Sequence, residues 1–131
     1  MKTPPEAAAS KTILIVEDNP INIGFISDYL HTFGYRVLAA RNGFEAIQKV
    51  SEEPVDLVLM DVQMPGMDGF EATRAIRSLP DGRQSSVPII MLTALVMPGD
   101  MERCMAAGAN HYMPKPINLK ELARTVQKTL G

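Results

Sequence analysis

Short apolar runs recur along this chain at nearly regular intervals and constrain its fold more than any other feature. Four runs of four to six residues and a weaker fifth can be marked: residues 13–16, 37–40, 55–60, 87–92 and 112–113. Strands with one face in water alternate apolar and polar residues, whereas continuous runs are typical of strands covered on both faces, as in parallel sheets. We therefore expect a core built around a buried parallel sheet.

Segments with helical periodicity lie between the runs. Asn19-Pro20 suits an N-cap followed by the first helical turn, and an apolar stripe with helical spacing follows it, made of Ile23, Ile26, Leu30 and Phe33. Further helices are expected over residues 44–50, 70–79, 98–107 and 119–130, with a polar loop over 80–86. Five consecutive strand–helix units predict an α/β fold with helices on both faces of the sheet and right-handed crossovers.

The length and composition indicate one domain and exclude some classes of partner. The 131 residues suffice for a single core, and residues 1–11 read as a flexible tail before a domain over 12–131. A net charge of -2 without a basic patch argues against direct nucleic-acid binding. No apolar run approaches the ~18 residues of a membrane span, no secretory signal opens the chain, and the single cysteine cannot form an internal disulfide. We expect a cytoplasmic protein without membrane insertion.

Chemically active side chains follow four of the predicted strands. Glu17 and Asp18 come after the first strand, Asp61 after the third, Thr93 after the fourth and Lys115 after the fifth. In open parallel sheets the functional crevice lies at the carboxyl ends of the strands, so these side chains are expected to converge. Taken singly, each has an ordinary structural explanation as a helix cap, a loop residue, the last strand residue or a surface turn.

Taken together, these five residues predict phosphoryl-transfer chemistry. Three carboxylates in one crevice repel one another and need a compensating cation, and a small set of hard oxygen ligands suits Mg²⁺. Lys115 adds a positive charge suited to phosphate oxygens. A metal, a lysine and a free carboxylate are the components of phosphoryl transfer, and a carboxylate can act as the nucleophile and form an aspartyl phosphate.

This constellation resembles the response-regulator receiver domain of two-component signalling. The matching stretches stand in the family's order and extend from about residue 12 to 130: ILIVEDNP (13–20), LVLMDVQMPGMDGFE (57–71), PIIMLTA (88–94) and AAGANHYMPKPI (106–117). The sequences of these stretches are similar to those of chemotaxis-regulator-like receivers, which are found attached to hybrid histidine kinases or as single-domain regulators. The resemblance implies a flavodoxin-like (βα)5 three-layer sandwich with strand order 2-1-3-4-5.

The resemblance also implies a role for each site residue. Asp61 is the phosphoacceptor, and Mg²⁺ is held by Glu17, Asp18, Asp61 and the backbone carbonyl of Gln63, with Asp18 the more direct of the acidic pair. Glu17 departs from the aspartate of many receivers but still supplies a carboxylate.

The remaining implied roles concern the phosphoryl group and the switch. Lys115 contacts the phosphoryl oxygens, and Pro116 follows a cis peptide bond. Thr93 moves toward the phosphoryl group, and the Tyr112 ring turns inward behind it. The domain catalyses only its own phosphorylation and slow dephosphorylation, so it is not an enzyme in the usual sense.

The implied partners are a histidine kinase or histidine phosphotransfer protein as donor, and a protein partner or a receiver dimer for output. Val96, Met97 and Met101, near the start of the predicted helix 98–107, suit an adaptable output face formed by that helix, the fifth strand and the last helix. The alternative is that these methionines belong to the core and that partners use the first helix.

Three other functions remain as alternatives. A haloacid-dehalogenase-like phosphatase needs a second aspartate two residues after the nucleophile, where this chain has Gln63. A flavin or dinucleotide carrier needs a phosphate-binding loop after the first strand, where this chain is acidic. A degenerate receiver would act only as an interaction module, and the five key residues argue against it.

Overall fold

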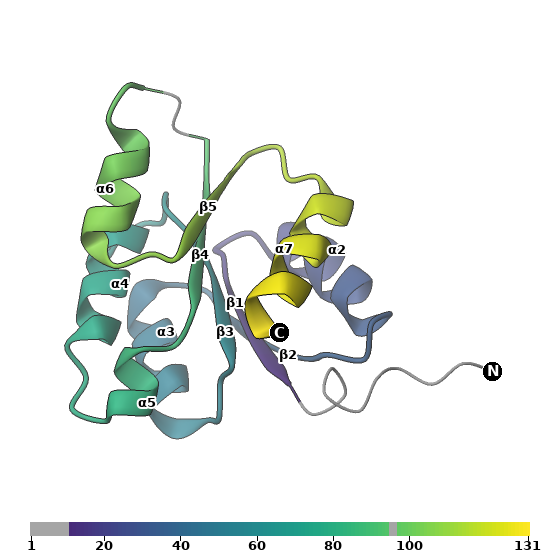
Figure 1. The fold of residues 1–131 in the computed structure, drawn as a ribbon, viewed down its shortest axis with the longest axis horizontal. Coiled ribbons are helices and arrows are strands. Elements are labelled where there is room, and N and C mark those ends of the chain that lie inside the picture. The colour runs from purple at the N-terminus through teal and green to yellow at the C-terminus, as the bar shows by residue number, and fades with distance from the viewer. Residues whose placement is uncertain (1–10, 95–96) are drawn as a thin grey trace.

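The computed structural model describes residues 11–94 and 97–131. The predicted flexible tail lies outside the described residues apart from Lys11. Strands and helices alternate along the described chain, as Figure 1 shows. In chain order they are β1 (Thr12–Val16), α2 (Pro20–His31), β2 (Arg36–Ala40), α3 (Gly43–Glu52), β3 (Leu57–Asp61), α4 (Gly69–Arg77), α5 (Gly82–Ser85), β4 (Ile89–Thr93), α6 (Asp100–Ala107), β5 (His111–Pro114) and α7 (Leu119–Leu130).

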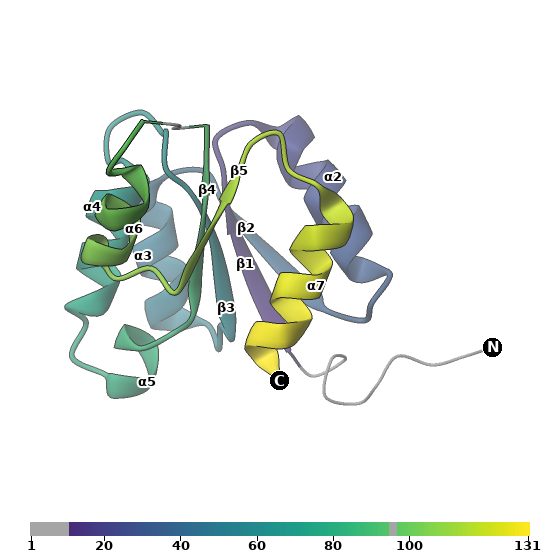
Figure 2. The same cartoon turned by 45° about the horizontal axis from the view of Figure 1, so that its top comes forward.

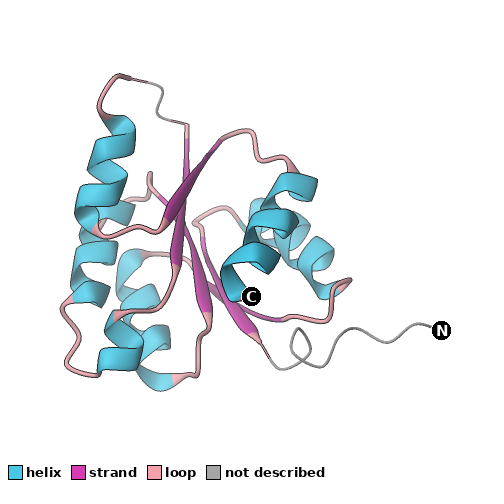
Figure 3. Ribbon diagram, in the orientation of Figure 1, coloured by secondary structure: helices cyan, strands magenta, loops and turns pink. Residues whose placement is uncertain are grey.

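The strands form one parallel sheet in the order β2-β1-β3-β4-β5. Helices cover both faces of this sheet, with α3, α4 and α6 on one side and α2 and α7 on the other (Figure 3). This arrangement confirms the predicted flavodoxin-like (βα)5 three-layer sandwich with strand order 2-1-3-4-5. Each crossover returns the chain to the same end of the sheet, so the loops that follow the strands share one edge.

The three central strands explain the continuous apolar runs. All residues of β1, β3 and β4 are buried, and their side chains point alternately into two separate apolar clusters. Leu14 and Val58 pack beneath α3 and α4, whereas Ile13 and Leu57 pack beneath α2 and α7. Each such aliphatic side chain stabilises the fold by about 1.5–3 kcal/mol. These strands are therefore a rigid support for whatever lies at their ends.

Three expectations differ from the structure in detail. The third and fourth strands include Asp61 and Thr93 as their last residues, because the backbone ladder continues past the apolar run: Val62 N–H donates to Leu92 O at 3.0 Å. The expected polar loop over 80–86 contains the short helix α5, which Asp81 caps through the N–H groups of two following residues. Phe44, expected in an apolar stripe, is exposed, because α3 packs through Gly43, Ala46 and Val50.

Candidate functional site

The parallel register brings the ends of β1 and β3 together. Val16 and Met60 are paired across the two strands, so the residues that follow them, Glu17 and Asp61, lie side by side. Figure 2 turns the edge that carries these strand ends toward the viewer, with the β5–α7 loop beside the start of α2. The site is therefore positioned by the sheet backbone rather than by a flexible loop.

Three carboxylates meet at this edge. Oxygens of Glu17, Asp18 and Asp61 all lie within 4.8 Å of one another. Glu17 and Asp61 are buried, with 4% and 3% of their surface exposed, whereas Asp18 is open to solvent. Two buried acids and one exposed acid, all offering oxygen, form a site of the kind that Mg²⁺ occupies when it keeps part of its water shell.

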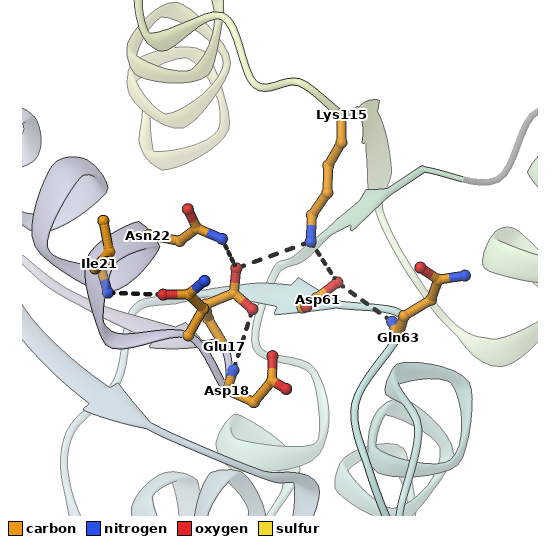
Figure 4. Close-up of polar contacts among 8 residues, drawn as sticks. Glu17, Asp18, Ile21, Asn22, Asp61, Gln63 and Lys115 are labelled. Atoms are coloured by element: carbon orange, nitrogen blue, oxygen red, sulfur yellow. Dashed lines mark hydrogen bonds and ion pairs between the residues drawn. The ribbon is translucent and has the colours of Figure 1, made fainter.

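Lys115 reaches the carboxylates from the other side of the edge. Its ammonium Nζ lies 2.9 Å from Asp61 Oδ1 and 3.8 Å from Glu17 Oε1. Figure 4 marks both contacts with dashed lines. The neighbouring strand β4 holds the lysine backbone in place, since Lys115 N–H donates to Thr93 O at 2.8 Å. The Lys115–Pro116 peptide bond is cis. Lys115 thus forms its closer ion pair with Asp61.

The charges of the cluster do not balance without a cation. Three ionised carboxylates and one ammonium leave two excess negative charges, which is the charge that one divalent ion neutralises. Burial, followed by the proximity of Asp61, raises the pKa of Glu17 above its ordinary value, although Asn22 and Lys115 oppose the shift. The donor set therefore fits Mg²⁺ both in its chemistry and in its charge.

Glu17 is held by contacts that the sequence did not suggest. Its Oε1 accepts a hydrogen bond from Asn22 Nδ2 at 2.8 Å, and its Oε2 accepts one from the Asp18 N–H at 3.1 Å. Asn22 lies in the first turn of α2, five residues beyond Glu17, and its side chain points back toward the acid (Figure 4). An amide in the helical turn after an acidic pair is the signal that could have identified it.

The start of α4 packs directly on the backbone of Asp61. Gly69 N–H donates to Val62 O at 2.9 Å, and a capping box between Asp68 and Glu71 fixes the helix terminus. A Cβ atom placed on Gly69 would lie 2.8 Å from Val62 Cα and closer still to the Asp61 carbonyl oxygen. This close approach needs a residue without a side chain, so Gly69 contributes to the placement of Asp61.

The other predicted site residues are Gln63, Thr93 and Tyr112. Gln63 is exposed, and its backbone N–H donates to Asp61 Oδ1 at 3.2 Å. Thr93 is buried at the end of β4, between β3 and β5. Tyr112 lies on β5 opposite Met91, and 41% of its surface is exposed. The structure thus gathers Glu17, Asp18, Asp61 and Lys115 at one point, with Tyr112 outside the cluster.

Comparison with known proteins identifies the family. Residues 13–127 match the family model described as the response regulator receiver domain. This chain belongs to that family. As a receiver domain it is 43% identical over 129 residues to the sensor protein GacS of Pseudomonas syringae pv. syringae, in a match that covers 98% of the chain. The chain spans only 14% of the length of that sensor protein. The resemblance to two-component receivers is confirmed.

A stand-alone regulator and solved receivers are similar to the chain over nearly their whole length. The polar-differentiation response regulator DivK of Brucella anthropi is 36% identical, over 92% of this chain and 97% of its own. The receiver domain of sensor histidine kinase PA1611 from Pseudomonas aeruginosa is 43% identical, with a TM-score of 0.82 over 92% and 98% of the two chains. Its crystal structure has a magnesium ion coordinated in the active site cleft.

The chemotaxis protein CheY4 of Vibrio cholerae is a further structural relative. It is 33% identical, with a TM-score of 0.83 over 91% of this chain and 98% of its own. The chain is therefore a two-component receiver domain with the fold that its sequence predicted.

Among the described residues, no helix has both the length and the apolar character that crossing a membrane requires.

Proposed function

We propose that this receiver accepts a phosphoryl group on Asp61 in a Mg²⁺-dependent reaction. The observation that carries the proposal is the pairing of a buried Asp61 with Lys115 at 2.9 Å, beside two further carboxylates whose oxygens lie within 4.8 Å. A cation site and a fixed ammonium around it are the arrangement that a carboxylate nucleophile for phosphoryl transfer requires.

The proposed reaction moves a phosphoryl group from a phosphohistidine to Asp61. An oxygen of the Asp61 carboxylate attacks phosphorus, the new P–O bond forms as the P–N bond breaks, and the departing imidazole takes up a proton from solvent. Glu17, Asp18, Asp61 and the Gln63 carbonyl would hold Mg²⁺, which when bound supplies positive charge to the phosphoryl oxygens. Lys115 would turn from its ion pair with Asp61 to those oxygens.

The same residues account for a slow loss of the phosphoryl group rather than general phosphatase activity. Gln63 stands two residues beyond the nucleophile and offers an amide, which cannot act as general acid or base for water attack. The domain thus promotes both the phosphorylation of its own aspartate and the slow loss of that phosphoryl group. This assignment separates it from a haloacid-dehalogenase-like enzyme.

The proposal is tested by phosphorylation with acetyl phosphate and Mg²⁺, followed by intact-mass and peptide mass spectrometry. We expect one base-labile phosphoryl group on Asp61, none in Asp61→Asn, and none after chelation of Mg²⁺. Asp28→Asn is the matched control, because Asp28 is an exposed aspartate on α2 that lies outside the carboxylate cluster. Unmodified parent protein would favour a degenerate receiver, and phosphate on Ser, Thr or His would refute the assignment.

The donor would be a histidine kinase or a histidine phosphotransfer protein. A cleft of about 440 Å³ opens beside the site between α2 and the start of α7, with Glu17 and Lys115 on its walls. Phe25 lines this cleft with 66% of its surface exposed, and Ile21 on the same helix is 67% exposed. Apolar side chains next to the phosphoacceptor suit a docking helix that presents its histidine to Asp61.

The output face would comprise α6, β5 and α7, and would bind a protein or a second receiver rather than DNA. Met97, Met101 and Met105 are 69%, 47% and 48% exposed, so a core role for these methionines is disfavoured. Val96 lies outside the described residues. Beryllofluoride, a phosphoryl mimic, should alter amide hydrogen exchange in residues 97–113. Changes limited to the strand-end loops would refute this face. A cytoplasmic location remains a prediction.

A further inference from the structure

The first acid of the pair is a glutamate, and its extra methylene creates a positioning problem. A longer side chain has one more rotatable bond, so a Glu17 carboxylate can sample more positions than an aspartate at the same place. In the structure it has one position, because each of its two oxygens accepts a hydrogen bond. One donor is the adjacent Asp18 N–H, which would be present whatever the side chains, and the other is the Asn22 side chain.

We propose that Asn22 is a positioning residue that fixes the Glu17 carboxylate for metal binding and prevents it from moving closer to Lys115. The proposal rests on the function proposed above and extends it to a residue outside the acidic cluster. Asn22 Nδ2 lies 2.8 Å from Glu17 Oε1, and that same oxygen is 3.8 Å from Lys115 Nζ. Asn22 and Lys115 therefore both contact the same carboxylate oxygen, and Asn22 has the shorter contact.

The geometry shows what the loss of this contact would do. Without Asn22, the strongest remaining attraction on Glu17 Oε1 is the ammonium of Lys115. A Glu17 carboxylate that moved toward Lys115 would draw the lysine from Asp61, to which it is bound at 2.9 Å. Two changes would follow together. The Glu17 carboxylate would no longer be held in one position beside Asp18, and Lys115 would no longer be paired with Asp61. Partners that orient metal-binding groups commonly have effects of this kind.

Asn22 is also placed so that its role can be separated from stability. It lies in the first turn of α2 and is exposed apart from this contact, and it lines the cleft beside the site. The test uses Asn22→Ala and Glu17→Asp, singly and together. The shorter aspartate side chain in Glu17→Asp moves the acceptor oxygen away from Asn22. Gln127→Ala, an exposed amide on α7, is the matched control for the loss of a helical amide.

The first measurement uses the metal-free protein and does not depend on phosphorylation. In two-dimensional ¹⁵N NMR spectra, the Asn22 side-chain amide protons should show one strongly shifted, slowly exchanging resonance in the parent. That resonance should return to the position of a solvated amide in Glu17→Asp. An Asn22 amide that is unchanged by Glu17→Asp would overturn the proposal, even if Asp61 proves to be the phosphoacceptor.

The second measurement is Mg²⁺ affinity from NMR titration of backbone amides. Asn22→Ala should weaken binding roughly tenfold when residue 17 is glutamate, and by less than about twofold in the Glu17→Asp background. Gln127→Ala should leave the affinity unchanged. Equal losses in both backgrounds would refute the positioning role, since they would indicate a general effect on α2. A parent that binds no Mg²⁺ would refute the proposed function instead.

Discussion

Exchange of Gly69 for alanine should displace Asp61, the proposed phosphoacceptor, whereas the same exchange at Gly24 should stabilise the protein. Both glycines lie in helices and neither has a positive φ, so alanine is compatible with the backbone at both positions. The difference between them is tertiary. A Cβ on Gly24 meets nothing within 4 Å, but a Cβ on Gly69 meets the backbone of Asp61 and Val62.

The size of the destabilisation depends on which atoms the new Cβ atom would contact. The Cβ that Gly69→Ala introduces would lie 2.8 Å from Val62 Cα, below the 3.0 Å that real Cβ contacts essentially never breach, and nearer still to Asp61 O. Both are backbone atoms, so no side-chain rotation can relieve the overlap, and α4 must move away from β3. Overpacking of this kind costs about 1–3 kcal/mol. Gly24→Ala should instead stabilise α2 by about 0.5–1 kcal/mol, as alanine does within helices.

The assay is thermal and urea denaturation of both variants, paired with the rate of phosphorylation by acetyl phosphate. For a domain of this size, 1 kcal/mol corresponds to a shift in Tm of roughly 3–5 °C. Gly69→Ala should lower Tm and slow phosphorylation, because α4 packs on the backbone of Asp61, the proposed nucleophile. Gly24→Ala should raise Tm and leave the rate unchanged. If the two variants had the same stability, the steric argument would be refuted.

Three further predictions concern polar groups that are buried or half-buried. Arg77→Met should destabilise the fold by about 2–4 kcal/mol in urea denaturation, because it removes the donor from four acceptors: the carbonyl oxygens of Gly108, Ser85 and Val87 and the side-chain oxygen of Asn110. Thr73→Val should be neutral or stabilising by up to about 1 kcal/mol, since Thr73 Oγ1 is the buried side-chain atom without a partner among the described residues; a loss above that value in the same assay would contradict it. Glu17→Gln should stabilise the metal-free fold at neutral pH, because burial raises the pKa of Glu17 above its ordinary value of 4.5. A carboxyl group whose pKa is higher in the folded protein than in the unfolded chain contributes its full stability below the unfolded pKa, and that contribution is lost as the pH rises through the folded pKa. The gain in stability from Glu17→Gln, measured by thermal denaturation, should therefore grow from about pH 4.5 upward. A gain that is largest in acid would contradict this prediction.

Much of this protein could be predicted from the sequence, because both the pattern and the chemistry are local. A strand buried on both faces must be apolar at every position, so β1, β3 and β4 are visible as runs, and the crossover rule then places their ends on one edge. Acids, a hydroxyl and a lysine at these ends indicated a site, since nothing in a buried sheet requires them there. The motif order then identified the receiver family.

Other features depend on contacts between segments far apart in the sequence, and only the tertiary structure decided them. The ladder from β3 to β4 places Asp61 inside the strand, although the apolar run ends one residue earlier. The rotation of α3 leaves Phe44 in solvent, where its apolar character alone suggested a packed face. Residue types and their period determine which elements form, but the contacts of Asn22 with Glu17, and of Gly69 with the backbone of Asp61, exist only once those elements pack against one another.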